Sequence, residues 1–407
     1  MREGGRGTAG GSIRRFRAQH IFVIVQVALA LVLMVGAGLL TRSFRAQLGI
    51  DTGSELEPVA AMRMQLPRSR YADQEAIQTF ASEIERRASE MPGISSASIS
   101  NDLPFRGGSS GAYVYRQDAP DDRIRFHMHA VSEGYFETLG IRVVEGRSFT
   151  PEDVESAPSV GVITQAMVRR VFPEGGAIGR TMFFGSGGQN PFEIVGVIED
   201  LRYRNLTTSL MAEGNSPDVF FPYAQLPTRT IEVAVRADGD PSVIGPVMRR
   251  MVAEIDPDLP VFQVQPLMTS YNLQMSTPRF AAFLMGLFST LAVVLACVGI
   301  YGVLSFAVGQ RSQEIAIRRA IGASAPSVAR TVVGDGLKLV IAGLFVGSIG
   351  AVTGSRVLRA FLFEVEATDP LTFVAVGGTM VSVALVAAII PAVRAARRDP
   401  AGALSAE

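Results

Sequence analysis

The pattern of apolar and charged positions divides the chain into four uncharged runs and one long segment of mixed composition. The uncharged runs cover residues 21–40, 280–310, 339–355 and 371–393. A helix rises about 1.5 Å per residue, so about 20 residues cross a hydrocarbon core of about 30 Å. The pattern therefore predicts a membrane α-helical protein with four transmembrane helices in a one-plus-three arrangement and a large α/β domain, residues 41–279, between helices one and two.

Two of these runs differ from an ordinary membrane span. Basic residues precede residues 21–40, as in a secretory signal, but the apolar part of a signal is only about 7–15 residues long, so we expect a retained anchor. As a helix, residues 280–310 would be about 46 Å long, which exceeds the hydrocarbon core. This helix must either tilt or continue into water as a stalk.

Residues 41–279 alternate between helical and strand-like patterns. Apolar residues recur at helical spacing over residues 73–91 and 240–255. Asp240 suits an N-cap for the second of these helices, and Pro246 either kinks it or delays its start. Its expected apolar face comprises Val243, Ile244, Val247, Met248, Met251, Val252 and Ile255.

Strand-like runs complete the α/β pattern of this domain. They cover residues 59–66, 94–100, 160–164, 192–198 and 231–236. The middle of the segment is richer in glycine, proline and loops than its two ends. We therefore expect a base formed by residues 51–100 and 229–275, with residues 101–228 inserted as a lobe.

The distribution of arginine and lysine predicts the orientation in the membrane. Basic residues outnumber acidic ones in residues 1–20, 309–338 and 394–407, whereas acidic residues prevail between the third and fourth spans. Short basic segments stay on the cytoplasmic side. Both termini and the 309–338 loop are thus expected in the cytoplasm, with the large domain on the other side of the membrane. The remaining boundaries are a leader at 1–20, a cytoplasmic helix at 311–324, a third transmembrane helix at 325–355 and a tail at 394–407.

Several kinds of chemistry are excluded or weakly indicated. The balanced charge gives no sign of nucleic-acid binding. The single cysteine, Cys297, permits no intramolecular disulfide. The single lysine, Lys338, follows leucine, so the Gly-Lys-Ser/Thr end of a phosphate-binding loop is absent and the chain cannot hold that ATP site alone.

An enzymatic site has only weak candidates. Ser109 lies in a Gly-x-Ser-x-Gly pattern, but the strand and helix that a nucleophile elbow needs do not flank it. His127 and His129 would share one face of a strand, yet a zinc site needs a third ligand. A flexible loop and a structural or surface role are the simpler interpretations. A membrane-anchored hydrolase stays the least favoured hypothesis.

Small residues follow helical spacing in the third uncharged run. Gly343 and Gly347 are four residues apart, as are Gly350 and Gly354. This spacing allows close helix–helix packing, although glycine-rich membrane composition could also produce it. No charged residue lies within the four uncharged runs, where ion or proton carriers usually place one.

The stretch 311–324 is the most specific motif in the chain. Its residues Glu314 and Arg318 form an i,i+4 pair, and Gly322 suits the end of a short helix. The sequence EIAIRRAIGA within this stretch resembles the signature of MacB/FtsX-type ABC transporter permeases. Further resemblance lies in residues 26–44, 131–149, 369–373 and 391–400, so that it covers essentially the whole chain.

The resemblance implies a function and a set of partners. Such permeases work as pairs, with a second permease copy and two copies of a separate ATPase that binds ATP and Mg²⁺, so no cofactor is expected in this chain. Export members also use a periplasmic adaptor and an outer-membrane channel. The resemblance implies that motion of the ATPase passes to the outer domain, and the residues expected to contact the ATPase are Glu314, Ile315, Ile317, Arg318, Arg319 and Gly322.

The resemblance leaves two questions open. Regulation of a cell-wall hydrolase and lipoprotein extraction are alternatives to export. The most similar permeases contain two tandem copies of the unit seen here once, so the chain is either a single-copy permease or a separated half. The substrate, too, is not indicated.

Overall fold

The computed structural model describes residues 9–49, 51–107, 110–185, 190–204, 216–310, 317, 324–358, 362 and 365–397. Two compact units make up the chain. The first, here called the helical unit, combines Met1–Leu48 with Thr277–Glu407. The second, here called the extramembrane domain, is Gly49–Ser276.

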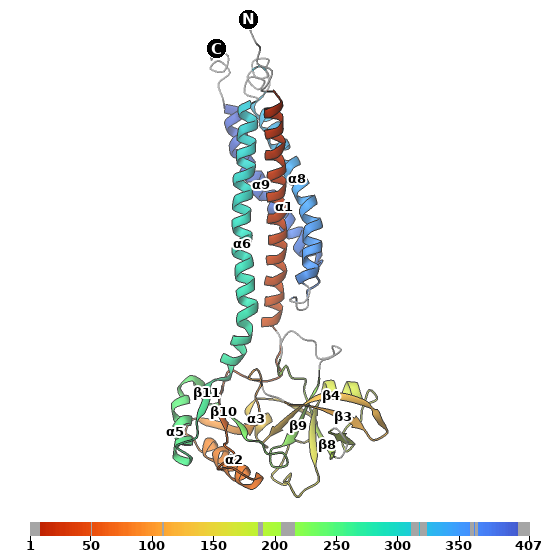
Figure 1. The fold of residues 1–407 in the computed structure, drawn as a ribbon, viewed down its shortest axis with the longest axis vertical. Helices are drawn as coiled ribbons and strands as arrows, with labels where there is room; N and C mark the ends of the chain where they lie inside the picture. The colour runs from red at the N-terminus through yellow and green to blue at the C-terminus, as the bar shows by residue number, and fades with distance from the viewer. Residues whose placement is uncertain are drawn as a thin grey trace. The chain divides into compact units, whose positions relative to one another are not determined.

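Four helices long and apolar enough to cross a membrane confirm the predicted spans (Figure 1). They are α1 (Ala9–Leu48), α6 (Leu267–Gln310), α8 (Ala325–Leu358) and α9 (Pro370–Arg397). All four extend beyond the uncharged runs of the sequence. Helix α6 has 44 residues and is continuous, which gives it a length of about 66 Å. The helix therefore begins well before the uncharged run that starts at Phe280.

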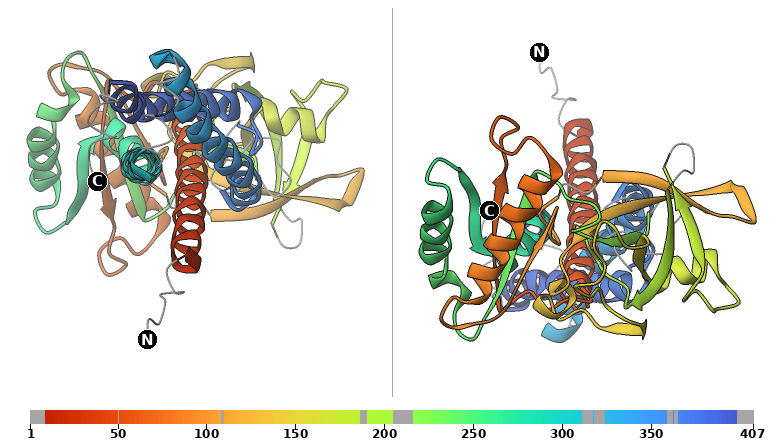
Figure 2. Two further views of the ribbon diagram at one scale, coloured as in Figure 1. Left: turned by 90° about the horizontal axis from the view of Figure 1, so that it is seen from above. Right: turned by 90° about the horizontal axis from the view of Figure 1, so that it is seen from below.

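Helices α1, α6, α8 and α9 together form the core of the helical unit, and α8 packs closely against both α1 and α9 (Figure 2). Helix α1 contributes much of this core, including Val27, Leu31 and Leu39, each at most 2% exposed. Helix α6 contributes Ile300 and Leu304 to this core and exposes other large apolar side chains, such as Phe283 and Leu295. Exposed apolar side chains of this kind are suited to lipid or to contact with other membrane helices.

The extramembrane domain contains eleven strands within its described residues. The strands are β1 (Val59–Gln65), β2 (Ile94–Ser100), β3 (Ser110–Arg116), β4 (Ala119–Val131), β5 (Val143–Gly146), β6 (Val160–Thr164), β7 (Thr181–Phe184), β8 (Asn190–Ile198), β9 (Asp218–Pro222), β10 (Thr230–Ala237) and β11 (Val261–Pro266). Its shorter helices are α2 (Gln74–Ser89), α3 (Tyr135–Thr138), α4 (Gln165–Val171), the 3-10 turn η1 (Pro241–Val243) and α5 (Gly245–Ile255).

The strand order divides this domain into two parts. Strands β11, β1, β10 and β2 form an open antiparallel sheet, here called the base sheet. The order then continues through β4, β3, β7, β8, β6 and β9, and β9 pairs with β4, which closes these six strands into a barrel. Among the described residues, Ser100 and Val131 are the one register pair between the base sheet and the barrel.

Helices α2 and α5 pack together beside the base sheet (Figure 2). Asp73 caps α2 through its side chain, which accepts a hydrogen bond from the backbone N–H of Ala76 at 2.9 Å. The buried residues of α2 follow the helical spacing expected over residues 73–91: Ile77, Phe80, Ala81, Ile84 and Ala88. The helical spacing of apolar residues was therefore a sufficient signal for this element.

The expected face of the second helix was partly wrong. Asp240 caps the short 3-10 turn, and α5 starts only at Gly245, with Pro246 in its first turn. The proline thus delays the helix rather than kinking it. Because the helical register begins late, Val243 and Val247 are 68% and 49% exposed, whereas Met248, Met251 and Val252 are buried.

The barrel has a separate core that is rich in phenylalanine. Phe126, Phe192 and Phe221 are almost completely buried, with the Phe192 and Phe221 ring centroids 5.0 Å apart. Gly161 allows Phe192 to lie directly over β6, because a Cβ at this glycine would come within 2.6 Å of the Phe192 ring. Two cores, one beside the base sheet and one inside the barrel, thus stabilise the extramembrane domain.

Candidate functional site

The residues expected to contact an ATPase lie largely beyond the part of the chain that the structure describes. Glu314, Ile315, Arg318, Arg319 and Gly322 are outside the described residues. Ile317 is described as helical, and its side chain is 49% exposed. These assignments therefore stay predictions.

The four glycines of α8 lie against α1. A Cβ added at Gly343 would be 2.7 Å from the Cβ of Val27, and one at Gly347 would be 2.9 Å from the Cα of Ala28. The corresponding positions at Gly350 and Gly354 would be 3.2 and 3.9 Å from methyl carbons of Val32. The two helices therefore approach most closely at Gly343 and Gly347, where a side chain would displace α1.

Polar contacts connect α1 to the first turn of α9. Arg42 of α1 forms an ion pair with Asp369, the residue that precedes α9. The same carboxylate accepts a hydrogen bond from the backbone N–H of Thr372 at 2.8 Å, so Asp369 also caps α9. The end of α1 and the start of α9 thus lie at the same end of the helical unit, as alternating spans require.

The first turns of α6 are fixed within the extramembrane domain. Leu267, Tyr271 and Met275 are each at most 6% exposed. The rings of Tyr271 and Phe105 meet edge to face, with centroids 5.4 Å apart. Phe105 adopts a backbone φ of 63°, an uncommon value for a bulky residue, which indicates that its surroundings determine its position.

A buried charge cluster lies next to Phe105. The Arg106 Nε is 3.0 Å from Glu232 Oε2, and the Arg63 Nε is 2.5 Å from Glu232 Oε1. Arg106 also donates a hydrogen bond of 2.9 Å to the backbone carbonyl of Gln263 in β11, shortly before α6. Burial raises the pKa of Glu232, and the two guanidinium groups act against that rise. This cluster connects the centre of the base sheet to β11, the strand that leads directly into the first turn of α6.

A second buried cluster surrounds His129 of β4. Its Nδ1 is 2.7 Å from Asp102 Oδ1, and its Nε2 is 2.8 Å from Asp218 Oδ1. Arg204 donates a hydrogen bond of 2.8 Å to the same oxygen of Asp218. Burial lowers the pKa of His129, but the Asp102 charge and the hydrogen bonds outweigh this effect and raise it to about 9. His129 is therefore a buried cation between two carboxylates.

The weak enzymatic candidates of the sequence are placed as follows. Ser109 lies outside the described residues. Both ring nitrogens of His129 are used by carboxylates. Burial, with the nearby Arg204 charge, lowers the pKa of His127 to about 4. Within the described residues, no group of three or more histidine, cysteine, aspartate or glutamate side chains is placed to hold a metal ion.

Neither of the two buried charge clusters was predicted from the sequence. The one available signal was Glu232, a carboxylate between apolar neighbours within a strand of high β propensity. Its arginine partners come from positions 63 and 106, which are far away in sequence. Asp102 and Asp218 had no signal at all, since each lies in a segment rich in loop-forming residues.

Comparison with known proteins gives two family matches that together cover most of the chain. Residues 22–253 match the model described as the MacB-like periplasmic core domain. Residues 286–400 match the model described as the FtsX-like permease C-terminal region. The boundary between the two matches lies near the start of α6.

Individual relatives are distant. The uncharacterized ABC transporter permease YvrN of Bacillus subtilis is 22% identical over 296 residues, which cover 69% of this chain and 70% of YvrN. The macrolide export ATP-binding/permease protein MacB of Chromobacterium violaceum is 23% identical over 291 residues, which cover 68% of this chain. The match spans only 43% of that MacB.

Among solved structures, the periplasmic region of MacB from Actinobacillus actinomycetemcomitans is 15% identical, with a TM-score of 0.38. The match covers 56% of this chain and 98% of that structure. The first family model alone matches more than half of the chain, and the second matches most of the remainder. The chain belongs to the MacB/FtsX-type family of ABC transporter permeases.

Proposed function

We propose that this chain is the permease subunit of an ABC transporter and that it transmits motion of a separate ATPase to the extramembrane domain for export. The observation that supports the proposal most directly is helix α6. Its first turns are packed into the extramembrane domain through Tyr271, and the same continuous helix then includes an apolar stretch long enough to cross the membrane. In the proposed mechanism, a displacement of the cytoplasmic end of this helix passes along α6, through the turn that contains Pro278, to the residues packed in the domain.

The proposed orientation follows the distribution of basic residues. The termini and residues 311–324 face the cytoplasm, and the extramembrane domain lies on the other side of the inner membrane. Residues 311–324 contact the ATPase, which holds ATP and Mg²⁺. A second permease copy completes the transporter, and a periplasmic adaptor with an outer-membrane channel is the expected route for exported material. The names of relatives as macrolide exporters support export as the direction.

The glycine contacts between α8 and α1 support transmission rather than conduction. Close backbone approach makes the helical unit stiff, and stiffness is what a mechanical connection needs. We propose that Gly343, Gly347, Gly350 and Gly354 keep α1 and α8 together as one body while the ATPase moves. Helix α6 has fewer such contacts and is the element proposed to shift.

The test is stimulation of ATP hydrolysis by a candidate partner ATPase that co-purifies with this chain. The double variant Arg318→Glu with Arg319→Glu should reduce co-purification and abolish the stimulation, because both guanidinium charges are reversed at the proposed contact. The matched control reverses two exposed arginines of the barrel, Arg123→Glu with Arg125→Glu, and should leave stimulation unchanged. Unchanged hydrolysis in the first variant contradicts the coupling assignment.

The orientation has its own test. Protease added to sealed, right-side-out spheroplasts should cleave within residues 51–275, whereas inverted vesicles should protect them. The reverse result excludes the proposed direction of transmission.

A further inference from the structure

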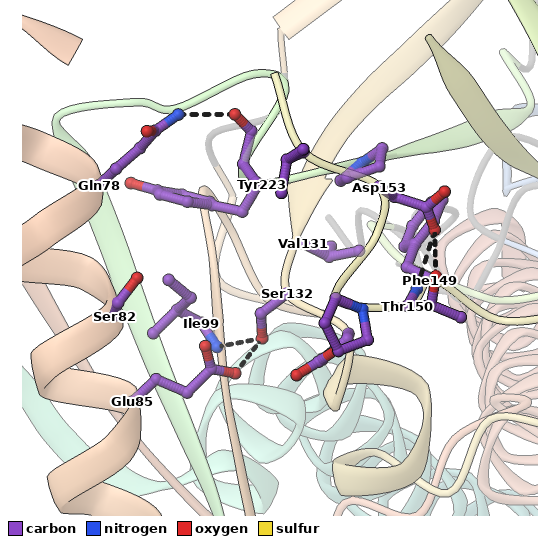
Figure 3. Close-up of a pocket in the computed structure, with 15 residues that line it drawn as sticks. Gln78, Ser82, Glu85, Ile99, Val131, Ser132, Phe149, Thr150, Asp153 and Tyr223 are labelled. Atoms are coloured by element: carbon purple, nitrogen blue, oxygen red, sulfur yellow. Dashed lines mark hydrogen bonds between the residues drawn. The ribbon is translucent and has the colours of Figure 1, made fainter. Parts of the chain in front are cut away.

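A cavity of about 330 Å³ opens in the extramembrane domain, at the place where the base sheet meets the barrel (Figure 3). Strand β2 contributes Ile99, and the end of β4 contributes Val131 and Ser132. These residues adjoin the register pair of Ser100 and Val131. The rest of the wall comes from α2, the segment 149–154 and the end of β9. The cavity therefore lies between the two cores of the domain.

One wall of the cavity carries an acidic side chain without a basic partner. Glu85 extends from α2 toward Ser132, whose hydroxyl donates a hydrogen bond to the Glu85 carboxylate (Figure 3). The Ser132 oxygen in turn accepts a hydrogen bond of 3.0 Å from the backbone N–H of Ile99. Within the part of the chain that the structure describes, no arginine, lysine or histidine forms an ion pair with Glu85.

The other acidic groups of the lining do not compensate for this charge. Glu133 is also in the wall, and its charge acts on Glu85. Asp153 differs, because Arg147 donates two hydrogen bonds to it, of 2.7 and 2.9 Å. Arg147 is thus already paired with Asp153, and no arginine, lysine or histidine is among the lining residues that the structure describes, so the lining is acidic.

The remaining wall combines apolar side chains with the polar residues Gln78, Ser82 and Thr150. Ile99, Val131, Phe149, Pro151 and Tyr223 all line the cavity. Small-molecule sites typically combine such walls with a few fixed polar groups, in volumes of about 300–1,000 Å³. A volume at the lower end of this range suits a small molecule rather than a large one.

We propose that this cavity binds a small organic cation, a protonated amine that pairs with Glu85 while its apolar body lies against Val131, Phe149 and Tyr223. An ion pair with a partly buried carboxylate is stronger than one in water, because the local dielectric constant is lower. A ligand at this position touches both the base sheet and the barrel, so its binding also fixes the two parts relative to each other.

The ionisation of Glu85 agrees with this assignment. Burial raises the pKa of Glu85 to about 7, the Ser132 hydrogen bond acts against the rise, and the charge of Glu133 adds to it. An empty site therefore holds a carboxyl group that is only partly ionised at neutral pH. A bound cation would favour the ionised form.

The experiment uses the full chain in nanodiscs of zwitterionic lipid, without any ATPase, so its result is independent of the proposed transport function. The probe is 4-fluorophenethylamine, and its neutral analogue is 2-(4-fluorophenyl)ethanol. Binding is measured from ¹⁹F line broadening, with empty nanodiscs subtracted. We expect saturable binding of the amine and at least about tenfold weaker binding of the alcohol, the ratio that corresponds to one charge-assisted contact.

Glu85→Gln should weaken amine binding by about tenfold or more and leave the alcohol unaffected. Glu75→Gln is the matched control, because Glu75 is exposed on the same helix and does not line the cavity. Two further variants test whether the amine occupies the cavity. Ser82→Trp places a large side chain in the cavity and should prevent binding, whereas Ser89→Trp, on the same helix but outside the lining, should not. Amine binding that is absent in the wild type, or equal in the wild type, Glu85→Gln and Ser82→Trp, overturns the proposal.

Discussion

The imidazole of His129 is bound to the carboxylate of Asp102 at 2.7 Å, in a place where solvent reaches neither side chain appreciably. Asp218 occupies the other side of the ring at 2.8 Å, and the rings of His129 and Phe220 stack with centroids 4.8 Å apart. A cation in such surroundings is stable only because two carboxylates neutralise it. This cluster fixes the start of β9 and the segment around Asp102 against β4.

The His129 cluster predicts a loss of stability in alkaline solution. The folded-state pKa, about 9, lies above the ordinary value of 6.5, so the contribution is complete below about pH 6.5 and disappears as the pH rises through 9. His129→Asn should lower the free energy of unfolding by about 3–5 kcal/mol at pH 6.5, because it leaves the buried Asp102 without a cationic partner and Asp218 with Arg204 alone.

The measurement is thermal unfolding of the full chain between pH 6.5 and 9.5. The difference in unfolding temperature between wild type and His129→Asn should shrink over this interval. A constant difference would show that His129 is neutral when folded. His127→Asn is the control, since the pKa of that histidine lies near 4 and the residue does not ionise in this window.

The α1–α8 contact predicts strong sensitivity at Gly347. Gly347→Ala places a Cβ 2.9 Å from the Ala28 backbone, which cannot move without displacing α1. Overpacking of this kind costs about 1–3 kcal/mol. Gly377→Ala on α9 is matched in chemistry, and its Cβ meets nothing within 4 Å. Unfolding in detergent should separate the two variants, and equal unfolding temperatures would contradict the close contact.

The buried first turns of α6 lead to a prediction about local hydrogen exchange. Tyr271→Ala removes the edge-to-face contact with Phe105, which is worth about 0.5–1.5 kcal/mol beyond the buried area. Amides of residues 267–276 should then exchange faster, while those of the barrel keep their rates. Leu273→Ala changes an exposed residue of the same helix and should have no such effect. Protection that is unchanged in Tyr271→Ala would exclude Phe105 as the anchor.

The arginine–glutamate cluster predicts strong coupling between two positions far apart in sequence. Arg106→Leu alone should cost about 3–5 kcal/mol, because it leaves Glu232 buried beside a single arginine. Adding Glu232→Leu should recover part of that loss. A double-mutant cycle on the unfolding free energy measures the coupling. The exposed pair of Arg86 and Glu90 provides the comparison, and its coupling should be smaller; equal couplings would contradict a buried pair.

Much of the fold could be predicted from residue periodicity. The four spans and helix α2 follow from apolar patterns, because burial on one face or in lipid requires such residues at regular spacing. Strands β2 and β6 have the expected bounds, Ile94–Ser100 and Val160–Thr164. Sequence patterns predicted these elements correctly because the spacing of apolar residues within each element is enough to show which of its residues are buried.

Relations between distant segments could not be predicted in the same way. Closure of the barrel depends on β9 meeting β4, and nothing in either strand alone specifies the other. Arg106 and Glu232 are likewise paired by topology, 126 positions apart in numbering. The delayed start of α5 shows that prediction can also fail within one element. Pro246 allowed either a kink or a later start of the helix, and the sequence pattern could not distinguish them.

The single register pair of Ser100 and Val131 has a mechanical consequence. A sheet resists shear through many hydrogen bonds in parallel, and here the ladder between the two parts is short: beside this pair, Asn101 donates to the carbonyl of Ala130 and Ser132 to that of Ile99. We therefore expect bending of the domain to be easiest at this short ladder, beside Glu85 and Ser132. A crystal form, a ligand or a neighbouring protein that alters the angle between base sheet and barrel should do so by rotation about this point, with both cores preserved.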